Sequence, residues 1–521
     1  MLVIVLWSPV DLARFFHGRR GPRRIAADWP ERWPESTLYF SEAPHMSRRF
    51  FSWTEARRFY AIGLPIFIAQ LSQVGMNFAD TAMTGQASAE DMAAVAVAGS
   101  IWAPLSLLGL GSLFALPPLT AQMVGAGDRN GAAHLLRQGI WLTCGISVLF
   151  MSLFYAVSWH MAAFGLEPEL ARLAGGYLRA ILWGMPGFML FVNQRSFLEG
   201  FSRTRPAMII GMLGLTFNVP CNYMLIYGKF GLPALGAVGC GVATALCYWF
   251  MALAMFYYLR RDPQYRDLHP IYAPLFSRRA ARQRDGSAPD YPRFDPALIL
   301  RILRIGLPSA LALFFEVSLF AVTAILLAPL GTVAVAGHQI ATNFSTLMFM
   351  FPLALGMTAT IRVGHCLGAD KMEQARVAAR TALGLSVLFA LAIAVCTVAF
   401  RYGIVRIYND DPVVTALAAH LLFYAACYQV VDGLQTVALG VLRGYNDTRI
   451  ISVICFLAYW VIGLPLGFTL ARTNWIVPAM GPAGFWIAYI TALSFGACCY
   501  LWRVRFLHHL GDAAIRARVR R

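Results

Sequence analysis

Long apolar segments recur along the chain from Phe59 onward and are separated by short polar connections. Each segment is long enough to cross a bilayer as a helix, since about 20 apolar residues span the hydrocarbon core. The pattern predicts twelve membrane-spanning helices, at 59–83, 92–120, 133–158, 170–197, 206–227, 236–259, 299–328, 333–361, 374–400, 414–440, 450–471 and 482–504. We therefore expect an all-α integral membrane protein.

The connections between these segments alternate in basic content. Arg48, Arg49, Arg57 and Arg58 precede the first span, and further arginines gather in the alternate connections that follow. The intervening connections, such as GQASAED, are poor in basic residues. Because cytoplasmic loops carry the excess of Lys and Arg, the pattern predicts a multi-pass protein of the inner (plasma) membrane with both termini in the cytoplasm.

Short motifs of the first half of the chain return in the second half. IGLP at 62–65 returns at 305–308, and LEGFSRTR at 198–205 returns as LRGYNDTR at 442–449. These repeats predict two six-helix bundles related by a pseudo-twofold axis along the membrane normal, with a cavity between them. The predicted division is an N-terminal extension at 1–50, an N-terminal bundle at 51–260, a cytoplasmic linker at 261–297, a C-terminal bundle at 298–507 and a basic tail at 508–521.

The N-terminal extension differs in composition from the rest of the chain. It is rich in Trp, Pro and Arg, and its opening apolar run is too short to span a membrane. We interpret it as disordered or interfacial. In the alternative interpretation, translation starts at Met46 and not at Met1.

Composition narrows the class of protein further. The chain is 58% hydrophobic and 13% charged, whereas a soluble protein carries about 25% charged residues. The net charge of +17 would suit nucleic acid, but the basic residues lie in loops between apolar segments, so we expect no nucleic-acid partner. The ten cysteines form no CxxC pair and no GxxxxGK[ST] motif occurs, which argues against a zinc site and against ATP hydrolysis. We expect no enzyme activity and no cofactor.

Three acids lie well inside apolar segments, and these carry the main functional hypothesis. Asp80 is late in the first span, Glu316 is in the middle of the seventh and Asp432 is in the tenth. A carboxylate inside the membrane costs a few kcal/mol, so it usually faces a cavity or a partner and marks a functional site. The alternative is a protonated acid that is hydrogen-bonded between helices. As ion-binding groups, the acids can hold a proton or Na⁺, and Na⁺ is a candidate at Glu316 and Asp432.

Helical spacing places further side chains beside these acids. These candidates for a substrate cavity are Gln73, Phe320, Tyr428, Gln435 and, before Pro220 in the fifth span, Asn218. An aromatic ring attracts an organic cation by about 0.5–2 kcal/mol, although packing against neighbouring helices is the alternative for any single ring. For Asn218 the alternative is an interhelical hydrogen bond.

With these residues assembled, the chain resembles the multidrug and toxic compound extrusion (MATE) family, in its bacterial NorM subgroup. The resemblance covers about residues 55–505 and rests on LPIFIAQLSQVGMNFADTAMTG, FFEVSLFAVTAILLAPLGTVAVAGHQIATN and VDGLQTVALGVLRGYNDTR. It implies a MATE-like fold and places the functional acids of the family at Asp80, Glu316 and Asp432. It likewise implies that Phe320 and Tyr428 are the aromatic residues of the seventh and tenth spans.

The resemblance implies a secondary active antiporter that expels cationic and amphipathic xenobiotics while Na⁺ or H⁺ enters, by alternating access. Its partners are then small organic cations and the lipid bilayer, and we expect a monomer. The alternative hypothesis is a flippase for lipid-linked precursors, which related doubled folds support. That activity needs a cavity lined by cations, whereas the charges found in mid-span are acids. A third class, a receptor or structural protein without transport activity, predicts no flux of dye.

Overall fold

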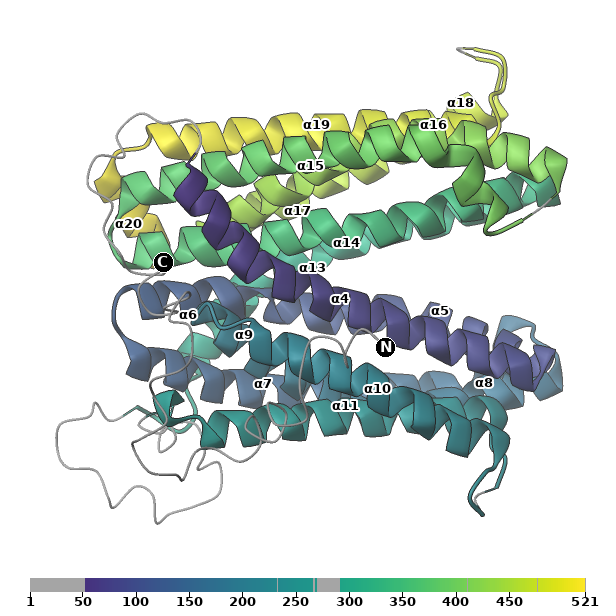
Figure 1. Cartoon of the computed structure of the whole chain (residues 1–521), viewed down its shortest axis with the longest axis horizontal. Helices are drawn as coiled ribbons and strands as arrows, with labels where there is room; N and C mark the ends of the chain where they lie inside the picture. Colours follow the sequence, from purple (N-terminus) through teal and green to yellow (C-terminus); the bar gives the residue numbers. More distant parts are fainter. Residues whose placement is uncertain are drawn as a thin grey trace, which may run out of the picture.

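The computed structural model describes residues 52–231, 233–265, 268, 291–409, 411–475 and 477–520. Nearly all of them are helical (Figure 1). The predicted extension at 1–50, with the question of Met1 or Met46, lies outside the described residues, as does most of the predicted linker.

The first half of the chain forms a bundle built mainly from long apolar helices. Its helices are α4 (Trp53–Ala87), α5 (Ala89–Ser112), η1 (Leu113–Ala115), α6 (Leu116–Gly125), α7 (Arg129–Trp159), η2 (Met161–Phe164), α8 (Pro168–Ile181), η3 (Leu182–Gly184), α9 (Met185–Gly200), α10 (Arg205–Tyr227), α11 (Gly236–Arg261) and η4 (Pro263–Tyr265). Polar side chains cap several of these helices, as Ser88 Oγ does by accepting from the Asp91 N–H over 2.9 Å.

The second half of the chain repeats this arrangement. Its helices are α13 (Pro296–Leu327), η6 (Ala328–Leu330), α14 (Thr332–Gly368), α15 (Met372–Arg406), α16 (Pro412–Gly444), α17 (Arg449–Phe456), the π-helical turn η7 (Leu457–Gly463), α18 (Leu464–Arg472), α19 (Pro482–His509) and α20 (Asp512–Arg520).

Among the described residues, eleven helices are long and apolar enough to cross a membrane. The remaining predicted span, 170–197, is built from α8, η3 and α9, which follow one another along the same neighbour, α11. Neither α8 nor α9 reaches 18 residues by itself, so each piece is short while the run from 168 to 200 is as long as its neighbours. The predicted all-α membrane fold with its twelve-helix plan is confirmed.

Each half has its own apolar core, yet the first helix of each half begins on the other half. Ala56 and Phe59 near the start of α4 pack into the C-terminal core, whereas Ile302 and Ile305 near the start of α13 pack into the N-terminal core. Figure 1 shows α4, in dark purple, running diagonally from the side of α15 to the side of α10. The starts of α4 and α13 therefore pack against the opposite half of the chain.

A proline lies inside each of these crossing helices. Pro65 lies twelve residues after the first residue of α4, and Pro308 lies twelve residues after the first residue of α13. Because proline has no N–H to donate, each helix loses one backbone hydrogen bond near the point where it changes packing partner.

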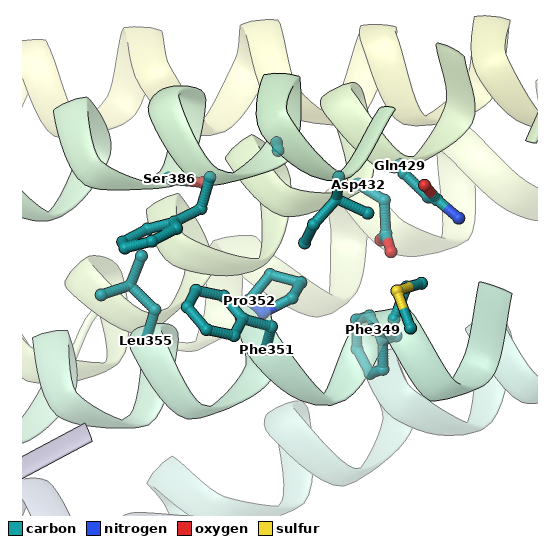
Figure 2. Close-up of a pocket in the computed structure, with 11 residues that line it drawn as sticks. Phe349, Phe351, Pro352, Leu355, Ser386, Gln429 and Asp432 are labelled. Atoms are coloured by element: carbon teal, nitrogen blue, oxygen red, sulfur yellow. The ribbon is translucent and has the colours of Figure 1, made fainter. Parts of the chain in front are cut away.

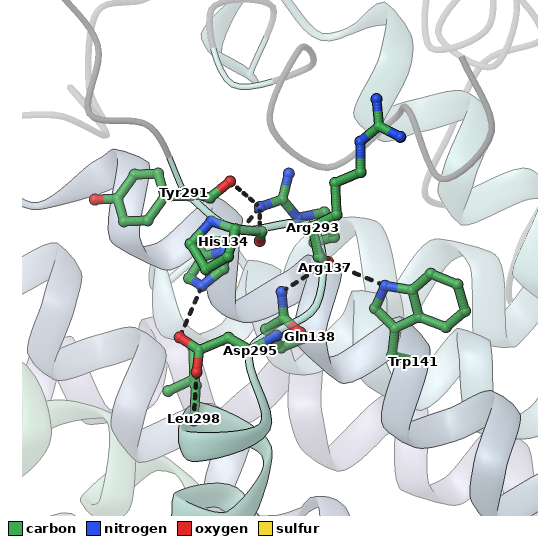
Figure 3. Close-up of polar contacts among 9 residues, drawn as sticks. His134, Arg137, Gln138, Trp141, Tyr291, Arg293, Asp295 and Leu298 are labelled. Carbon is green, nitrogen blue, oxygen red and sulfur yellow. Dashed lines mark hydrogen bonds and ion pairs between the residues drawn. The ribbon is translucent and has the colours of Figure 1, made fainter. Parts of the chain in front are cut away.

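The end of the linker is docked against the polar end of α7 (Figure 3). Arg137 donates to the Pro292 carbonyl over 2.6 Å, and Trp141 donates from its indole N–H to the Arg293 carbonyl over 3.2 Å. Asp295 lies 3.4 Å from His134 and accepts from the Leu298 N–H at the start of α13, a bond that holds the pKa of Asp295 below its usual range. The first turn of α13 is thereby fixed to the N-terminal half.

Candidate ion and substrate sites

The carboxylate of Asp80 on α4 is buried among neutral polar side chains of α10 and α11. Asn218 and Asn222 donate to its Oδ1 over 3.1 and 2.6 Å, and Thr244 donates to its Oδ2 over 2.8 Å. Asn222 also donates to Asn218 Oδ1 over 3.1 Å, and all four side chains are at most 6% exposed. These three partners are neutral, so none of them balances the charge of an ionised Asp80.

Of the two residues predicted from the sequence to lie near Asp80, Asn218 contacts it directly and Gln73 lies farther away on α4. Asn218 makes the interhelical hydrogen bond that was the alternative to a place in the cavity wall. Gln73 is half-buried two turns earlier on α4, whereas the side chains that donate to Asp80 come from α10 and α11. The structure therefore joins Asn218 to the acid directly and leaves Gln73 as a separate position on the same helix.

The other two acids lie together in the C-terminal half. Asp432 on α16 is 2% exposed and lies within electrostatic reach of Glu316, which is half-buried on α13. Arg443, in the last turn of α16, also interacts electrostatically with Glu316. The three acids predicted from the sequence thus lie at two places, Asp80 at one and the pair Glu316 and Asp432 at the other.

The predicted aromatic residues pack into a cluster beside that pair. The rings of Phe320 and Tyr428 meet edge-on with their centroids 6.3 Å apart. The ring of Tyr489 lies 5.0 Å from that of Phe320, and the ring of Trp486 lies 5.6 Å from that of Tyr428. Tyr428 interacts electrostatically with both acids. Tyr428 is only 6% exposed, and its ring is packed within this cluster.

Gln435 belongs to a different contact. Its Nε2 donates to the phenol oxygen of Tyr459 in η7. The Gln435 side chain therefore links α16 to the π-helical turn, one helical turn away from Asp432.

A small chamber of about 10 Å³ adjoins Asp432 between α14, α15 and α16 (Figure 2). This volume is about the room that one water molecule needs. Gln429 and Asp432 line it from α16, Ser386 from α15 and Pro352 from α14. Figure 2 shows the carboxyl group of Asp432 pointing from α16 toward α14.

The two halves are held together at the end that bears the arginine-rich connections. Arg362 on α14 makes a two-pronged ion pair with Glu55 of α4, at 3.0–3.2 Å, and both side chains are at most 3% exposed. Gln122 at the end of α6 donates to the Gly444 carbonyl over 3.0 Å and accepts from Asn446 over 2.9 Å. These polar contacts join the N-terminal half to the C-terminal half.

Glycines allow the backbones of the two halves to approach at this end. A Cβ on Gly125 would lie 2.2 Å from the His365 carbonyl oxygen, and a Cβ on Gly368 would lie 1.9 Å from the Gln122 carbonyl oxygen. Gly125 and Gly368 both open the repeated GA step of the two halves. The end of α6 and the end of α14, which are equivalent in the two repeats, therefore pack against each other.

Toward the opposite end, α4 and α14 expose polar side chains. The helices cross where Phe67 meets Phe351, with ring centroids 5.4 Å apart. Beyond that crossing, α4 exposes Asn77, and α14 exposes Gln339 and Asn343. Amide side chains are costly on a lipid-facing surface, so these positions indicate contact with water and not with lipid.

Several of these residues were not found from the sequence. Asn222 follows Asn218 by four residues, and this helical spacing is the pattern that would have found it. Thr244 and Arg443 carry no comparable pattern, because they reach the acids from other helices. Only the packing of α11 against α4 and of α16 against α13 brings them into place.

The MatE family model matches residues 65–224 and 308–469, which together cover more than half of the chain. The chain belongs to the MatE family. The two matched stretches are the two repeats, each beginning at the interior proline of its first helix. As a member of the MATE family, the chain is a multi-pass membrane transporter and not an enzyme.

Known proteins agree with this membership. The multidrug resistance protein MdtK of Edwardsiella ictaluri (strain 93-146) is 49% identical over 457 residues, which is 87% of this chain and 96% of that protein. The crystal structure of the eukaryotic MATE transporter AtDTX14 is similar with a TM-score of 0.76 and 18% identity, over 89% of this chain and 99% of that one. An outward-facing multidrug resistance MATE family transporter of the MOP superfamily has a TM-score of 0.75 and 19% identity, over 89% and 97%. The last two likenesses show the MATE fold.

Proposed function

We propose that this MATE-family chain is a secondary active multidrug efflux antiporter of the inner membrane, with both termini in the cytoplasm and acting as a monomer. It exports cationic and amphipathic xenobiotics in exchange for inward Na⁺ or H⁺. The observation that carries the proposal is a buried carboxylate inside each half, Asp80 and Asp432, whose charge is a binding site for a small cation. The multidrug resistance protein MdtK, at 49% identity, supports the substrate class.

The acids couple the two fluxes by charge. An inward ion releases about 2.3 kcal/mol per charge per 100 mV of membrane potential, in addition to its concentration gradient. The ion and a cationic substrate favour different states of the carrier, and exchange requires that each binds the two states with unequal affinity. Glu316 and Asp432 lie close enough that one cation near either acid changes the affinity of the other.

The arrangement of the halves supports an assignment to the outward-facing state. The halves meet at the arginine-rich end through Glu55, Arg362 and the paired glycines. Exposed amides on α4 and α14 lie beyond the crossing point, toward the other end. With the positive-inside orientation, this state opens the substrate cleft to the outside, where an exporter releases its substrate.

Two conservative substitutions test the proposal. In Glu316→Gln and in Asp432→Asn the side chain keeps its shape and loses its charge, so each protein should fold and reach the membrane yet export no ethidium-like dye. Dye efflux from cells that express each variant is the measurement. Glu169→Gln, on an exposed pair with Arg172, is the matched control and should export dye at the wild-type rate. Wild-type export by either acid variant would contradict the proposal.

A further inference from the structure

Arg443, in the last turn of α16, is a cation at the closure between the two halves. The next residue, Gly444, accepts from Gln122 of the N-terminal half over 3.0 Å. In the part of the chain that the structure describes, Arg443 Nε is buried without a hydrogen-bond partner, and none of the ion pairs includes Arg443. Arginine is rarely buried without a partner, because an unpaired charge inside a protein is costly. Another kind of contact therefore holds this guanidinium group.

That contact is an aromatic ring from the other half of the chain. The guanidinium carbon of Arg443 lies 4.6 Å from the ring centroid of Phe114, which belongs to η1 in the N-terminal half. The attraction between a cation and a ring face is worth about 0.5–2 kcal/mol, with the upper value where water is excluded. Phe114 therefore binds the charge of Arg443 across the boundary between the halves.

Close packing fixes the position of Phe114. A Cβ on Gly111 would lie 2.5 Å from Ala310 Cα, and a Cβ on Gly306 would lie 2.0 Å from the Ser112 carbonyl oxygen. These contacts hold the end of α5 directly against α13, two residues before Phe114. The ring is thus tied to the N-terminal half and has little freedom to follow Arg443.

Glu316 is the acid that the charge of Arg443 reaches. The two groups interact electrostatically, and Cys455 on α17 and Tyr500 on α19 each interact with both of them. Arg443 lies eleven residues after Asp432 on α16, about 16 Å nearer the arginine-rich end of the molecule. Among the described residues no ion pair joins Arg443 to Glu316, so the arginine is near this acid without being bound to it.

We propose that Phe114 holds the guanidinium group of Arg443 away from Glu316, and that Arg443 pairs with Glu316 when the halves separate at the arginine-rich end. Arg443 is then a built-in cation that displaces the inward ion from Glu316 toward the cytoplasm. The inference rests on the proposed function and deepens it, since it assigns the step that releases the ion. Phe114 is a positioning residue, because it acts on the acid through Arg443.

The two partners of Arg443 lie in different halves, and this makes its choice of partner depend on the state of the carrier. Leu319, three residues after Glu316 on α13, packs into the C-terminal core, so Glu316 and Arg443 belong to the same half. Phe114 belongs to the N-terminal half, so separation of the halves removes the ring and leaves the acid. Opposite charges attract far more strongly inside a protein than in water, so the freed arginine competes with a small cation.

Thermal unfolding of the purified full chain tests the ion pair without reference to transport. Glu316→Gln is made in the wild-type protein and in Phe114→Leu. Without the ring, Arg443 should pair with Glu316, so loss of the acid should lower the melting temperature by several degrees more in Phe114→Leu than in wild type. Phe114→Met, which fills the same space with another apolar side chain, repeats the test if Phe114→Leu does not fold. Equal effects of Glu316→Gln with and without the ring would overturn the proposal.

Ethidium binding to the same proteins in lipid nanodiscs tests the consequence for the acid. Phe114→Leu should bind ethidium about tenfold more weakly, because Arg443 then competes for Glu316. Phe114→Tyr keeps a ring face and should bind ethidium like wild type. A second change, Arg443→Gln, should restore the affinity of Phe114→Leu. If Arg443→Gln does not restore it, Phe114 supports the structure and does not act through Arg443, which would overturn the proposal.

Trp159→Leu is the matched control. The guanidinium carbon of Arg179 lies 4.6 Å from the Trp159 ring centroid, the same distance as in the proposed pair, and Trp159 is exposed at the end of α7. Removal of this ring should change neither the ethidium affinity nor the effect of Glu316→Gln on the melting temperature. A tenfold loss of affinity in Trp159→Leu would show that the effect is not specific to Phe114, and the proposal would fall.

Dye efflux from wild-type proteoliposomes separates failure of this inference from failure of the proposed function. Dye efflux together with equal effects of Glu316→Gln in the two backgrounds contradicts the role of Arg443 and leaves the antiporter standing. Extra destabilisation by Glu316→Gln in Phe114→Leu, in a protein that moves no dye, supports the pairing of Arg443 with Glu316 and contradicts the antiporter.

Discussion

At the scale of single residues, the environment of each acid matters more than its position in the sequence. Asp80 is buried with three neutral hydrogen-bond donors, whereas Asp432 keeps one oxygen without a hydrogen-bond partner among the described residues. A carboxylate with several neutral donors is stabilised in its charged form, and a carboxylate with a free oxygen is available to a cation. The two halves therefore hold their acids in different ways despite their common origin.

Removal of one donor from Asp80 is predicted to impair transport. Thr244→Val keeps the shape of the side chain and deletes the 2.8 Å bond to Asp80 Oδ2. An unsatisfied buried group costs about 1–3 kcal/mol, so we expect the protein to melt at a lower temperature and to export dye several-fold more slowly. The control is Thr216→Val on α10, whose exposed hydroxyl donates to the Met212 carbonyl over 3.0 Å. Equal dye export in the two variants would show that Thr244 has no role in the site.

The sequence predicted the acids and missed most of what surrounds them. Burial of a charge within an apolar segment is visible in the sequence, because the cost of the charge is local. Thr244 and Ser386 look like ordinary polar residues of a membrane helix, and only the packing of α11 and α15 gives them a partner or a cavity. Phe320 and Tyr428 were placed near the acids, but their packing against Tyr489 and Trp486 depends on α19.

At the scale of elements, α4 and α13 link the halves. Each begins on the opposite half and contains a proline twelve residues after its first residue. The docked linker fixes the start of α13 to α7, and the ion pair of Glu55 with Arg362 fixes the start of α4 to α14. The proposed alternating access would therefore bend both helices near Pro65 and Pro308, on the way to Asp80 and Glu316.

Loss of the ion pair between α4 and α14 should destabilise the protein. Glu55→Gln leaves Arg362 and Arg58 without their buried carboxylate, and such a change costs about 3–5 kcal/mol. Thermal unfolding of the purified protein should show a melting temperature lower by several degrees. Glu169→Gln removes a carboxylate from an exposed pair and should leave the melting temperature unchanged. If the two variants have the same melting temperature, the ion pair does not help to hold the two halves together.

At the scale of the whole molecule, the sequence predicted the plan well. The repeats predicted two similar bundles, and hydropathy located the spans, because both depend on patterns that extend over many residues. The span at 170–197 was found by hydropathy although its helix is interrupted at η3. What hydropathy could not predict is the exchange of α4 and α13 between the halves, since it depends on contacts such as Gly306 against Ser112.

The proposed outward-facing state predicts which surface is accessible from outside. Asn343→Cys lies on the exposed polar strip of α14, so a membrane-impermeant maleimide should label it in intact cells. Glu373→Cys, exposed near the arginine-rich end of α15, is the control and should react only after the cells are opened. Both are made after the ten native cysteines are replaced by alanine. Labelling of Glu373→Cys from outside would reverse the assigned orientation.

The central claim is that buried acids in two similar halves exchange a small inorganic cation for an organic one. Dye efflux from proteoliposomes, with Na⁺ and pH gradients imposed separately, tests it most directly. We predict that an inward Na⁺ or H⁺ gradient accelerates efflux from wild-type vesicles and has no effect on vesicles that contain Asp432→Asn. Efflux that is equally fast without any ion gradient, or that persists in Asp432→Asn, would contradict the account.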